Sequence, residues 1–310
     1  MESNRLFISN SEKYIASYYF DVELYNNNGA EPIFLSTLGH LKNPHIVAFS
    51  RDDSEVLIKN NNNIYEIYDL STLKKIFRFR GSKAYEENVF LLDDTIIVST
   101  NDGSVYSINR KNKKRNLLCR FGDYTYSQLY HIGKESYVLM GYKQETNTTD
   151  FNYFDIIDNV VVKEKKHVSS FKMSPAGIYR YYGTDYFMSG NKLVSFNHSN
   201  NAADVITFDF DECDLSYKIE IEFMGEIINC PGIDNEKMHL VKILGFNNLL
   251  FVAYHEAVFI LDLETKTIKN EIKLSYAITD IAVSASKRQL WLASPHNTKC
   301  LDIRSVSNLS

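Results

Sequence analysis

The sequence predicts an all-β protein in which one structural unit is repeated along the chain. Two segments far apart in the chain read alike, IYEIYDLSTLKKIFRF (Ile64–Phe79) and VFILDLETKTIKNEIKL (Val258–Leu274). Each has an apolar run, a short polar turn and a second run, which is the pattern of two strands joined by a tight turn. The chain also contains 21 Tyr and 19 Phe but a single Trp, and Tyr and Phe favour the half-buried surfaces of sheets.

An Asp or Asn follows an apolar run at seven places along the chain. These places are Asp21, Asp69, Asn109 with Arg110, Asp155, Asn197, Asp262 and Asp302. Most of the intervals between them are 40 to 48 residues long, and one is 65. Repeats of about 40–50 residues are typical of propeller blades. We interpret the seven residues as turn residues that accept backbone hydrogen bonds, and not as catalytic carboxylates.

Each repeat contains three or four short apolar runs separated by turn clusters, and no segment shows helical periodicity. In the second repeat the runs are HIVAFS, EVLIKN, NIYEIYD and KKIFRF. This pattern resembles the WD40-like and quinoprotein-like β-propellers over essentially the whole chain. Tyr68-Asp69 and Leu261-Asp262 stand where WD40 repeats have Trp-Asp, a dipeptide that this chain lacks. We therefore expect residues 1–310 to form a single domain, a seven-bladed β-propeller of four-stranded antiparallel blades.

Two features of the repeat need separate expectations. LFISNSEKYIASYYFD aligns with the second and third strands of a blade, so we expect the ring to close by pairing the two chain ends. The long interval predicts an acidic insertion at about residues 211–235, which is either an extended edge hairpin or a recognition loop over one face.

A candidate site lies where the predicted innermost strands begin. When these strands are aligned, five of six equivalent positions are polar and the sixth is Leu240. The five polar residues are His45, Asn88, Gln128, Ser169 and Thr279. They form either the wet mouth of a channel or a hydrogen-bonding ring for a polar ligand or peptide end. Tyr85, Tyr124 and Tyr126 precede two of these strands and either anchor a partner or pack between blades.

Tests for other chemistry give little. The sequence has no Gly-x-Ser-x-Gly, phosphate-loop or HExxH motif. His45, His131, His167 and His239 fall on or near innermost strands at different offsets, and the four cysteines form no CxxC pair, so we expect no metal and no cofactor. Asp52-Asp53 and Asp93-Asp94 are expected to be solvated turn residues. The basic run Asn109–Asn116 is expected to be a solvated turn, with a local anion or nucleic-acid patch as the alternative.

The leading functional prediction is a non-enzymatic scaffold that binds a protein or peptide partner on a propeller face. The formal net charge of −5 argues against a general nucleic-acid binder. The sequence shows no signal peptide and no long apolar run, so we expect a cytoplasmic protein with no membrane partner. One alternative is an enzyme, a hydrolase or lyase acting on a polar small molecule at the channel mouth. A weaker one is a propeller that holds a metal or cofactor through its histidines.

Overall fold

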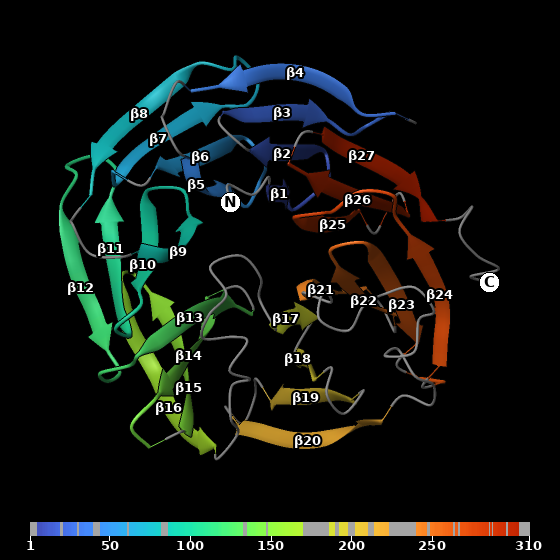
Figure 1. Cartoon of the computed structure of the whole chain (residues 1–310). Coiled ribbons are helices and arrows are strands. Elements are labelled where there is room, and N and C mark those ends of the chain that lie inside the picture. Colours follow the sequence, from blue (N-terminus) through green and yellow to red (C-terminus); the bar gives the residue numbers. More distant parts are fainter. Residues whose placement is uncertain are drawn as a thin grey trace. The chain divides into compact units, whose positions relative to one another are not determined.

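The computed structural model contains β-strands and no α-helix among the residues that it describes (Figure 1). These residues are 5–18, 21–29, 31–39, 44–60, 62–81, 86–132, 135–146, 148–169, 186–189, 192–197, 202–209, 214–222, 240–246, 249–262, 264–265, 267–284, 286, 288–295 and 297–303. The chain divides into two compact units, Phe7–Met173 and a second unit made of Met1–Leu6 with Ser174–Ser310. In the described part, no helix is long and apolar enough to cross a membrane.

The unit Phe7–Met173 contains four sheets in which strands consecutive in sequence are hydrogen-bonded neighbours. The first sheet is β1 (Arg5–Ile8, at the unit boundary), β2 (Tyr14–Tyr18), β3 (Val22–Asn26) and β4 (Ile33–Leu38). The second is β5 (Pro44–Phe49), β6 (Glu55–Asn60), β7 (Ile64–Asp69) and β8 (Lys75–Arg80). The third is β9 (Glu86–Leu91), β10 (Thr95–Thr100), β11 (Ser104–Asn109) and β12 (Arg115–Arg120). The fourth is β13 (Tyr126–His131), β14 (Ser136–Lys143), β15 (Thr148–Ile157) and β16 (Val160–Ser169).

The other unit contains three further sheets. Two have four strands, β17 (Tyr186–Ser189), β18 (Lys192–Asn197), β19 (Ala202–Asp209) and β20 (Asp214–Glu222), then β21 (Leu240–Phe246), β22 (Leu249–Tyr254), β23 (Ala257–Asp262) and β24 (Thr267–Lys273). The last has three strands within the described residues, β25 (Asp280–Ser284), β26 (Gln289–Ser294) and β27 (Asn297–Asp302). The prediction of antiparallel four-stranded sheets is thus confirmed for most of the chain.

The first strands of successive sheets are neighbours inside each unit. β9 contacts both β5 and β13 in one unit, and β21 contacts both β17 and β25 in the other. The fourth strands β8, β12 and β16 form the far edges of their sheets (Figure 1). Sheets arranged in this way face one another, so each buries side chains against the next one along the chain.

The hydrophobic core therefore lies in layers between consecutive sheets. One cluster joins Leu57 and Ile67 of the second sheet to Ile96 and Val98 of the third. The second strands are covered on both faces, which is why β10 reads TIIVST and is buried throughout. Burial falls toward the edge of the sheet, and β8, KIFRFR, exposes four of its six residues. Each pairing of a third with a fourth strand also contains a register shift, or bulge. Such a bulge increases the twist of the sheet toward its outer edge.

Turn chemistry explains where the third strands end. Among the described strands, those in third place end on Asn26, Asp69, Asn109, Ile157, Asp209, Asp262 and Asp302. The Asp69 carboxylate accepts a hydrogen bond from Thr72 N at 2.7 Å, and Asp262 accepts one from Thr265 N at 3.0 Å. The Asn109 side chain accepts one from Lys111 N at 3.0 Å. The turn role predicted for these three residues is confirmed.

The predicted phase of the repeat is wrong in three places. Asp21 lies between a second and a third strand, and Asn197 ends the second strand β18. Asp155 lies inside β15, where it is buried and accepts a hydrogen bond from Ser136 Oγ at 2.6 Å. The reason is that polar residues end strands of every rank, so an Asp after an apolar run does not identify the third strand.

Two further predictions fail with the phase. The first four runs of the chain form a complete sheet, so β1 does not join β25–β27, and the predicted pairing of the two chain ends in one blade is not observed among the described strands. The long interval was counted from Asn197, one strand too early, and part of the predicted insertion is the regular fourth strand β20. Residues 211–213 and 223–235 of that segment lie outside the described residues.

Candidate interaction surface

The side chain of the predicted ring residue Asn88 joins two neighbouring sheets. Its side-chain oxygen accepts a hydrogen bond from Leu129 N at 3.0 Å and one from Ser99 Oγ at 3.2 Å. Leu129 belongs to β13 and Ser99 to β10. The amide of β9 therefore fastens its own sheet to the first strand of the next, which is a structural use of a polar group near the sheet end.

Gln128 and Tyr126 lie together at the start of β13. Gln128 is buried, and Tyr126 Oη donates to its Oε1 at 3.4 Å. Between them Ser127 is also buried, and its hydroxyl donates to the carbonyl of Thr100 at 2.8 Å. This is a second polar link between the third and fourth sheets, and it leaves Tyr126, which is half-buried, as the more accessible of the two predicted residues.

Tyr124 is a packing residue of the sheet and not an exposed anchor. Its ring lies against Gly103 and Gly141, where an added Cβ would overlap it. Its hydroxyl donates to Asp150 Oδ2 at 3.1 Å and accepts from Asn152 Nδ2 at 2.9 Å. Burial raises the pKa of this phenol above its ordinary value. Of the two interpretations of Tyr124, the structure supports packing between sheets.

The carboxylate below this tyrosine is buried but neutralised. Lys166 Nζ lies 2.8 Å from Asp150 Oδ2 and Lys143 Nζ lies 3.0 Å from it. Burial raises the pKa of the Asp150 carboxyl, but hydrogen bonds from the two ammonium groups lower it more, so that the net shift is downward. A paired, ionised carboxylate of this kind stabilises the sheet and is a poor proton donor or acceptor.

The remaining predicted site residues are dispersed. Ser169 ends the outer strand β16 and pairs with Thr149, so its predicted place on a first strand is wrong. Thr279 belongs to the other unit, where its backbone N–H donates to the carbonyl of Ala293 at 2.8 Å. His45 lies in β5, but its side chain is outside the described residues, as is the whole of Tyr85.

At the opposite ends of the strands, carboxylates join sheets in a way that sequence reasoning missed. Asp53 was predicted to be solvated, but it is buried. It accepts hydrogen bonds from the backbone N–H groups of Asn10 at 2.9 Å and Ser11 at 2.7 Å, and also from the Ser11 hydroxyl. Asp52 is exposed as predicted and accepts from Ser54 within its own turn. Asp53 has a left-handed φ of 55°, which turns the chain there. The sequence Asp52-Asp53 does not show which of the two residues adopts this conformation.

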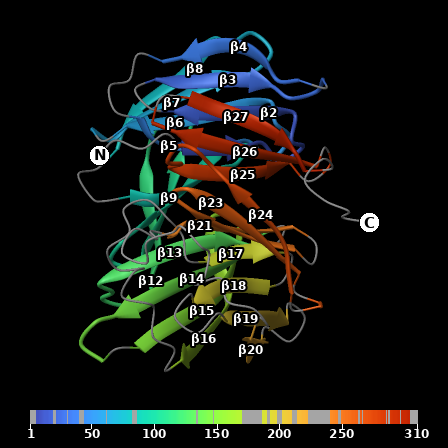
Figure 2. The ribbon, with the colours of Figure 1, turned by 45° about the vertical axis from the view of Figure 1, so that its right-hand side comes forward.

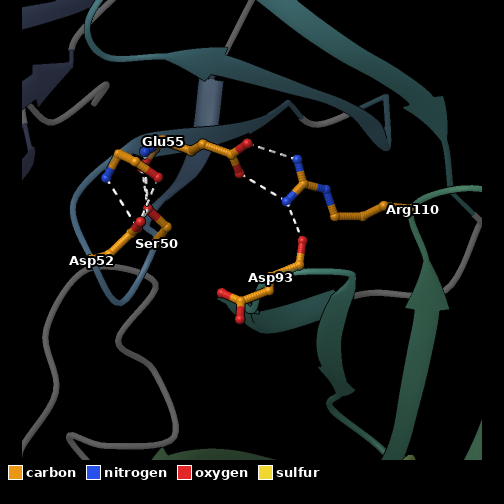
Figure 3. A network of polar contacts seen from close by, with 6 residues as sticks. Ser50, Asp52, Glu55, Asp93 and Arg110 are labelled. Atoms are coloured by element: carbon orange, nitrogen blue, oxygen red, sulfur yellow. Dashed lines mark hydrogen bonds and ion pairs between the residues drawn. The ribbon is translucent and has the colours of Figure 1, made fainter.

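A second link of this kind is centred on Arg110 (Figure 3). Its two terminal nitrogens contact the two oxygens of Glu55 at 2.8 and 2.9 Å, and Nη1 also donates to the carbonyl of Asp93. Glu55 begins β6 in the second sheet, whereas Asp93 lies in the turn after β9 in the third. The planar guanidinium suits this forked geometry, so Arg110 fastens the two sheets at the edge opposite to Asn88.

In the other unit, Asp280 performs the same task. It is buried, and its carboxylate accepts from Leu6 N at 2.8 Å and lies 2.7 Å from Lys242 Nζ. It thereby joins β25 to β1 and to β21. Asp280 directly follows the predicted residue Thr279. The sequence pattern therefore located the polar end of this sheet but not Asp280, the residue that makes the contacts there.

Five of the six exposed large apolar side chains of the described residues lie on outer strands in the unit Phe7–Met173, and the sixth, Ile157, ends the third strand β15. We call the outer-strand surface the exposed residues Ile33, Phe34, Ile76, Leu117 and Val160, which lie on β4, β8, β12 and β16. The basic turn predicted at Asn109–Asn116 lies beside it, with Lys111, Lys113 and Lys114 exposed. Lys113 Nζ lies 5.6 Å from the centre of the Phe77 ring of β8, so the turn reaches across to the neighbouring sheet.

The histidines and cysteines form no metal centre in the described part of the chain, where no group of three or more His, Cys, Asp or Glu could hold an ion. His131 is exposed, and its ring packs 5.0 Å from Tyr137 and 6.0 Å from Phe90. Cys119 is a free thiol, and burial raises its pKa to about 12, which makes it unreactive near neutral pH.

Comparison with known proteins supports the fold that these sheets suggest. No family model matches the chain, and no curated protein matches it. The β-propeller domain of Cps50 (Swd1) from Myceliophteria thermophila is similar with a TM-score of 0.70 and 10% identity, over 97% of this chain and 97% of that one. Hydrazine synthase from Kuenenia stuttgartiensis is similar with a TM-score of 0.64 and 8% identity, over 96% of this chain and 94% of that one. Likeness at this identity concerns the fold alone, and that fold is the β-propeller.

Proposed function

We propose that this protein is a non-enzymatic scaffold that binds a protein or peptide partner. The observation that supports this is that the polar side chains at the sheet ends and the exposed apolar side chains lie in different places and make different contacts. The polar residues at the sheet ends, such as Asn88, Asp53 and Arg110, are used to join sheets. Five of the six exposed large apolar residues among the described ones lie on outer strands, where contact with another protein would bury them.

The scaffold proposal includes a seven-bladed ring. It is supported by the seven described sheets and by third strands that end 40 to 53 residues apart. A compact domain of this length has a radius of gyration of about 19–20 Å. Small-angle X-ray scattering at several concentrations tests the ring, because two units that move independently would give a clearly larger radius.

We further propose that the partner binds the outer-strand surface. The alternative binding place is the set of first-strand ends. There, the variants use His45, which lies in the first strand β5, and Tyr126, which is half-buried at the start of the first strand β13. Two matched variants separate the places: Ile76→Ser with Leu117→Ser on the outer strands, and His45→Ala with Tyr126→Ala at the first-strand ends.

The test is affinity capture from native lysate followed by mass spectrometry and calorimetry with the purified partner. We expect one protein to be retained by the wild type and by the first-strand variant and to bind the outer-strand variant at least tenfold more weakly. Retention of no specific protein by any form would overturn the scaffold proposal. Loss of the partner only from the first-strand variant would move the contact to the channel mouth. A deletion across the predicted insertion, residues 212–233, is unsuitable as a test because it would remove the whole of β20.

An enzyme acting on a polar small molecule, a hydrolase or lyase, is the second candidate. It is kept because the fold likeness includes one enzyme, hydrazine synthase, although at 8% identity. Its test is a thermal-shift screen with polar metabolites, followed by the His45→Ala variant for any compound that stabilises the chain.

A further inference from the structure

The strand β4 is the outermost strand of the first sheet. It pairs with β3 on one side, and no described strand pairs with its other side (Figure 2). An outermost strand presents a row of unpaired backbone N–H and C=O groups to which another strand can be added. The other outer strands also have an unpaired edge. Their sequences therefore decide which of them can accept an added strand.

The outer strands differ in charge. β8 reads KIFRFR, β12 reads RNLLCR, β16 reads VVVKEKKHVS, β20 reads DLSYKIEIE, β24 reads TIKNEIK, and β27 of the three-stranded sheet reads NTKCLD. Each contains at least one Lys or Arg, and such residues on an edge discourage the addition of a strand. β4 reads IFLSTL and contains no charged residue. Among the described outer strands, β4 is the one without this protection.

The side chains of β4 supply apolar contact while the strand itself is anchored. Ile33 is 62% exposed and Phe34 is 53% exposed. Because they are consecutive, they point to opposite faces of the sheet and would flank an added strand on both sides. Leu38 is 2% exposed, and Leu35 packs against the core cluster behind the sheet. The edge is therefore held in place before any partner arrives, which reduces the entropy cost of binding.

The chain segment that contains this edge is acidic. From Tyr14 to His40 the sequence contains Asp21, Glu23 and Glu31 but no Lys or Arg. All three carboxylates are exposed. A second copy of this chain paired through the same edge would place acid against acid, whereas an added strand with Lys or Arg would meet opposite charge.

We propose that the outer edge of β4 receives an extended segment of a partner protein in which apolar and basic residues alternate. Backbone hydrogen bonds to β4 would supply the pairing. Because side chains alternate between the faces of a strand, the apolar ones of the partner would cover Ile33 on one face. The basic ones would lie on the other face, over Phe34 and near Glu23, since Tyr25 pairs with Phe34 and shares its face with Glu23. This inference rests on the proposed scaffold function and assigns a partner chemistry to one strand of the outer-strand surface.

The test uses the full chain and a synthetic capped peptide of eight residues in which Val and Lys alternate. Fluorescence anisotropy measures its binding, and hydrogen–deuterium exchange measures the amides of residues 33–38. We expect saturating peptide to slow exchange at 33–38 at least threefold and to leave residues 75–80 of β8 unchanged. A peptide with Glu in place of Lys is expected to bind at least tenfold more weakly.

Matched variants test the role of the edge. Ile33→Lys gives β4 the protection that β8 has, and we expect it to weaken peptide binding at least tenfold. Asn116→Lys places a lysine on an exposed position of another outer strand, β12, and is expected to leave peptide binding unchanged. Glu23→Lys with Glu31→Lys should reverse the preference, so that the Glu peptide binds better than the Lys peptide. Circular dichroism of each variant confirms that it is folded.

Three results would overturn the inference: no protection at 33–38 with the peptide present, equal loss in Ile33→Lys and Asn116→Lys, or a concentration-dependent dimer that Ile33→Lys abolishes. The last would show a second copy to be the occupant. The scaffold function fails separately, when no protein is captured by the wild type. A captured partner that binds Ile33→Lys as tightly as the wild type leaves the scaffold standing and removes β4 from it.

Discussion

The link between Arg110 and Glu55 offers a quantitative test of how the sheets are joined (Figure 3). Two parallel contacts of 2.8 and 2.9 Å bind the guanidinium to the carboxylate, and the side chains are only 16% and 18% exposed. Replacing Arg110 by Ala removes both contacts and the bond to the Asp93 carbonyl. It also leaves Glu55 as a largely buried carboxylate with no cation beside it.

The expected magnitude lies between two limits. Exposed ion pairs contribute about 0.2–1 kcal/mol, whereas breaking a fully buried pair costs about 3–5 kcal/mol. Because this pair is largely buried and bidentate, we expect a coupling free energy of about 2 kcal/mol. Arg110→Lys keeps the charge but loses the forked geometry, so it should retain about half of this energy.

The assay is a double-mutant cycle with Arg110→Ala and Glu55→Gln. The free energy of opening is measured from hydrogen exchange of the slowest amides in β6 and β11, which report on the two joined sheets. The neighbouring pair Lys111–Asp94 is a control from the same turn, since its contact of 3.0 Å joins side chains that are 75% and 66% exposed. Its coupling should stay below about 0.5 kcal/mol and disappear in high salt.

The reasoning would be refuted by a coupling for Arg110–Glu55 that is no larger than that of the control pair, or one that salt removes equally. Either result would mean that the pair is solvated and that packing alone holds the two sheets together.

Three further predictions concern the other links and turns. Asp53→Asn should lower the free energy of unfolding by about 2 kcal/mol, because two backbone donors lose a charged acceptor. The control Asp52→Asn should lower it by less than about 1 kcal/mol. Urea titration compares the two variants, and equal losses would contradict the inter-sheet role of Asp53. Gly141→Ala should cost about 1–3 kcal/mol through overlap with the buried tyrosine ring, while Gly122→Ala, whose added Cβ would lie 3.4 Å from that ring, should be nearly neutral in thermal melts. Hydrogen bonds from the hydroxyls of its turn hold the pKa of Asp69 at about 2, so its stabilisation is complete above about pH 4 and is lost as the pH falls toward 2; an NMR-titrated pKa near 3.9 would contradict this.

The fold could be predicted from sequence because its signals are local. A turn residue acts on the backbone two or three positions away, as Asp262 does, and alternating or continuous apolar runs report directly on burial. The phase of the repeat could not be obtained in the same way. Asn26 and Asp21 both follow apolar residues, and only strand pairing shows that Asn26 is the counterpart of Asp69.

The candidate site was harder to predict, because each link joins residues from different repeats. Asn88 and Gln128 lie on first strands as expected, but whether the Asn88 side chain faces solvent or Leu129 depends on the neighbouring sheet, which no local pattern describes. The same holds for Asp53 and Asp52, adjacent and chemically identical in sequence, of which one is buried against Ser11 and the other stays in solvent.

The phase of the repeat also decides what can be inferred about function. With Asp21 placed at the end of a third strand, IFLSTL would belong to no defined position, and its lack of charge would have no meaning. With Asn26 in that place, the same six residues are the fourth strand β4, directly comparable with KIFRFR and RNLLCR. The comparison then separates edges that repel an added strand from one that does not. The proposed difference between blades therefore depends on residues that the fold does not require, because an outer strand can form with or without charged side chains.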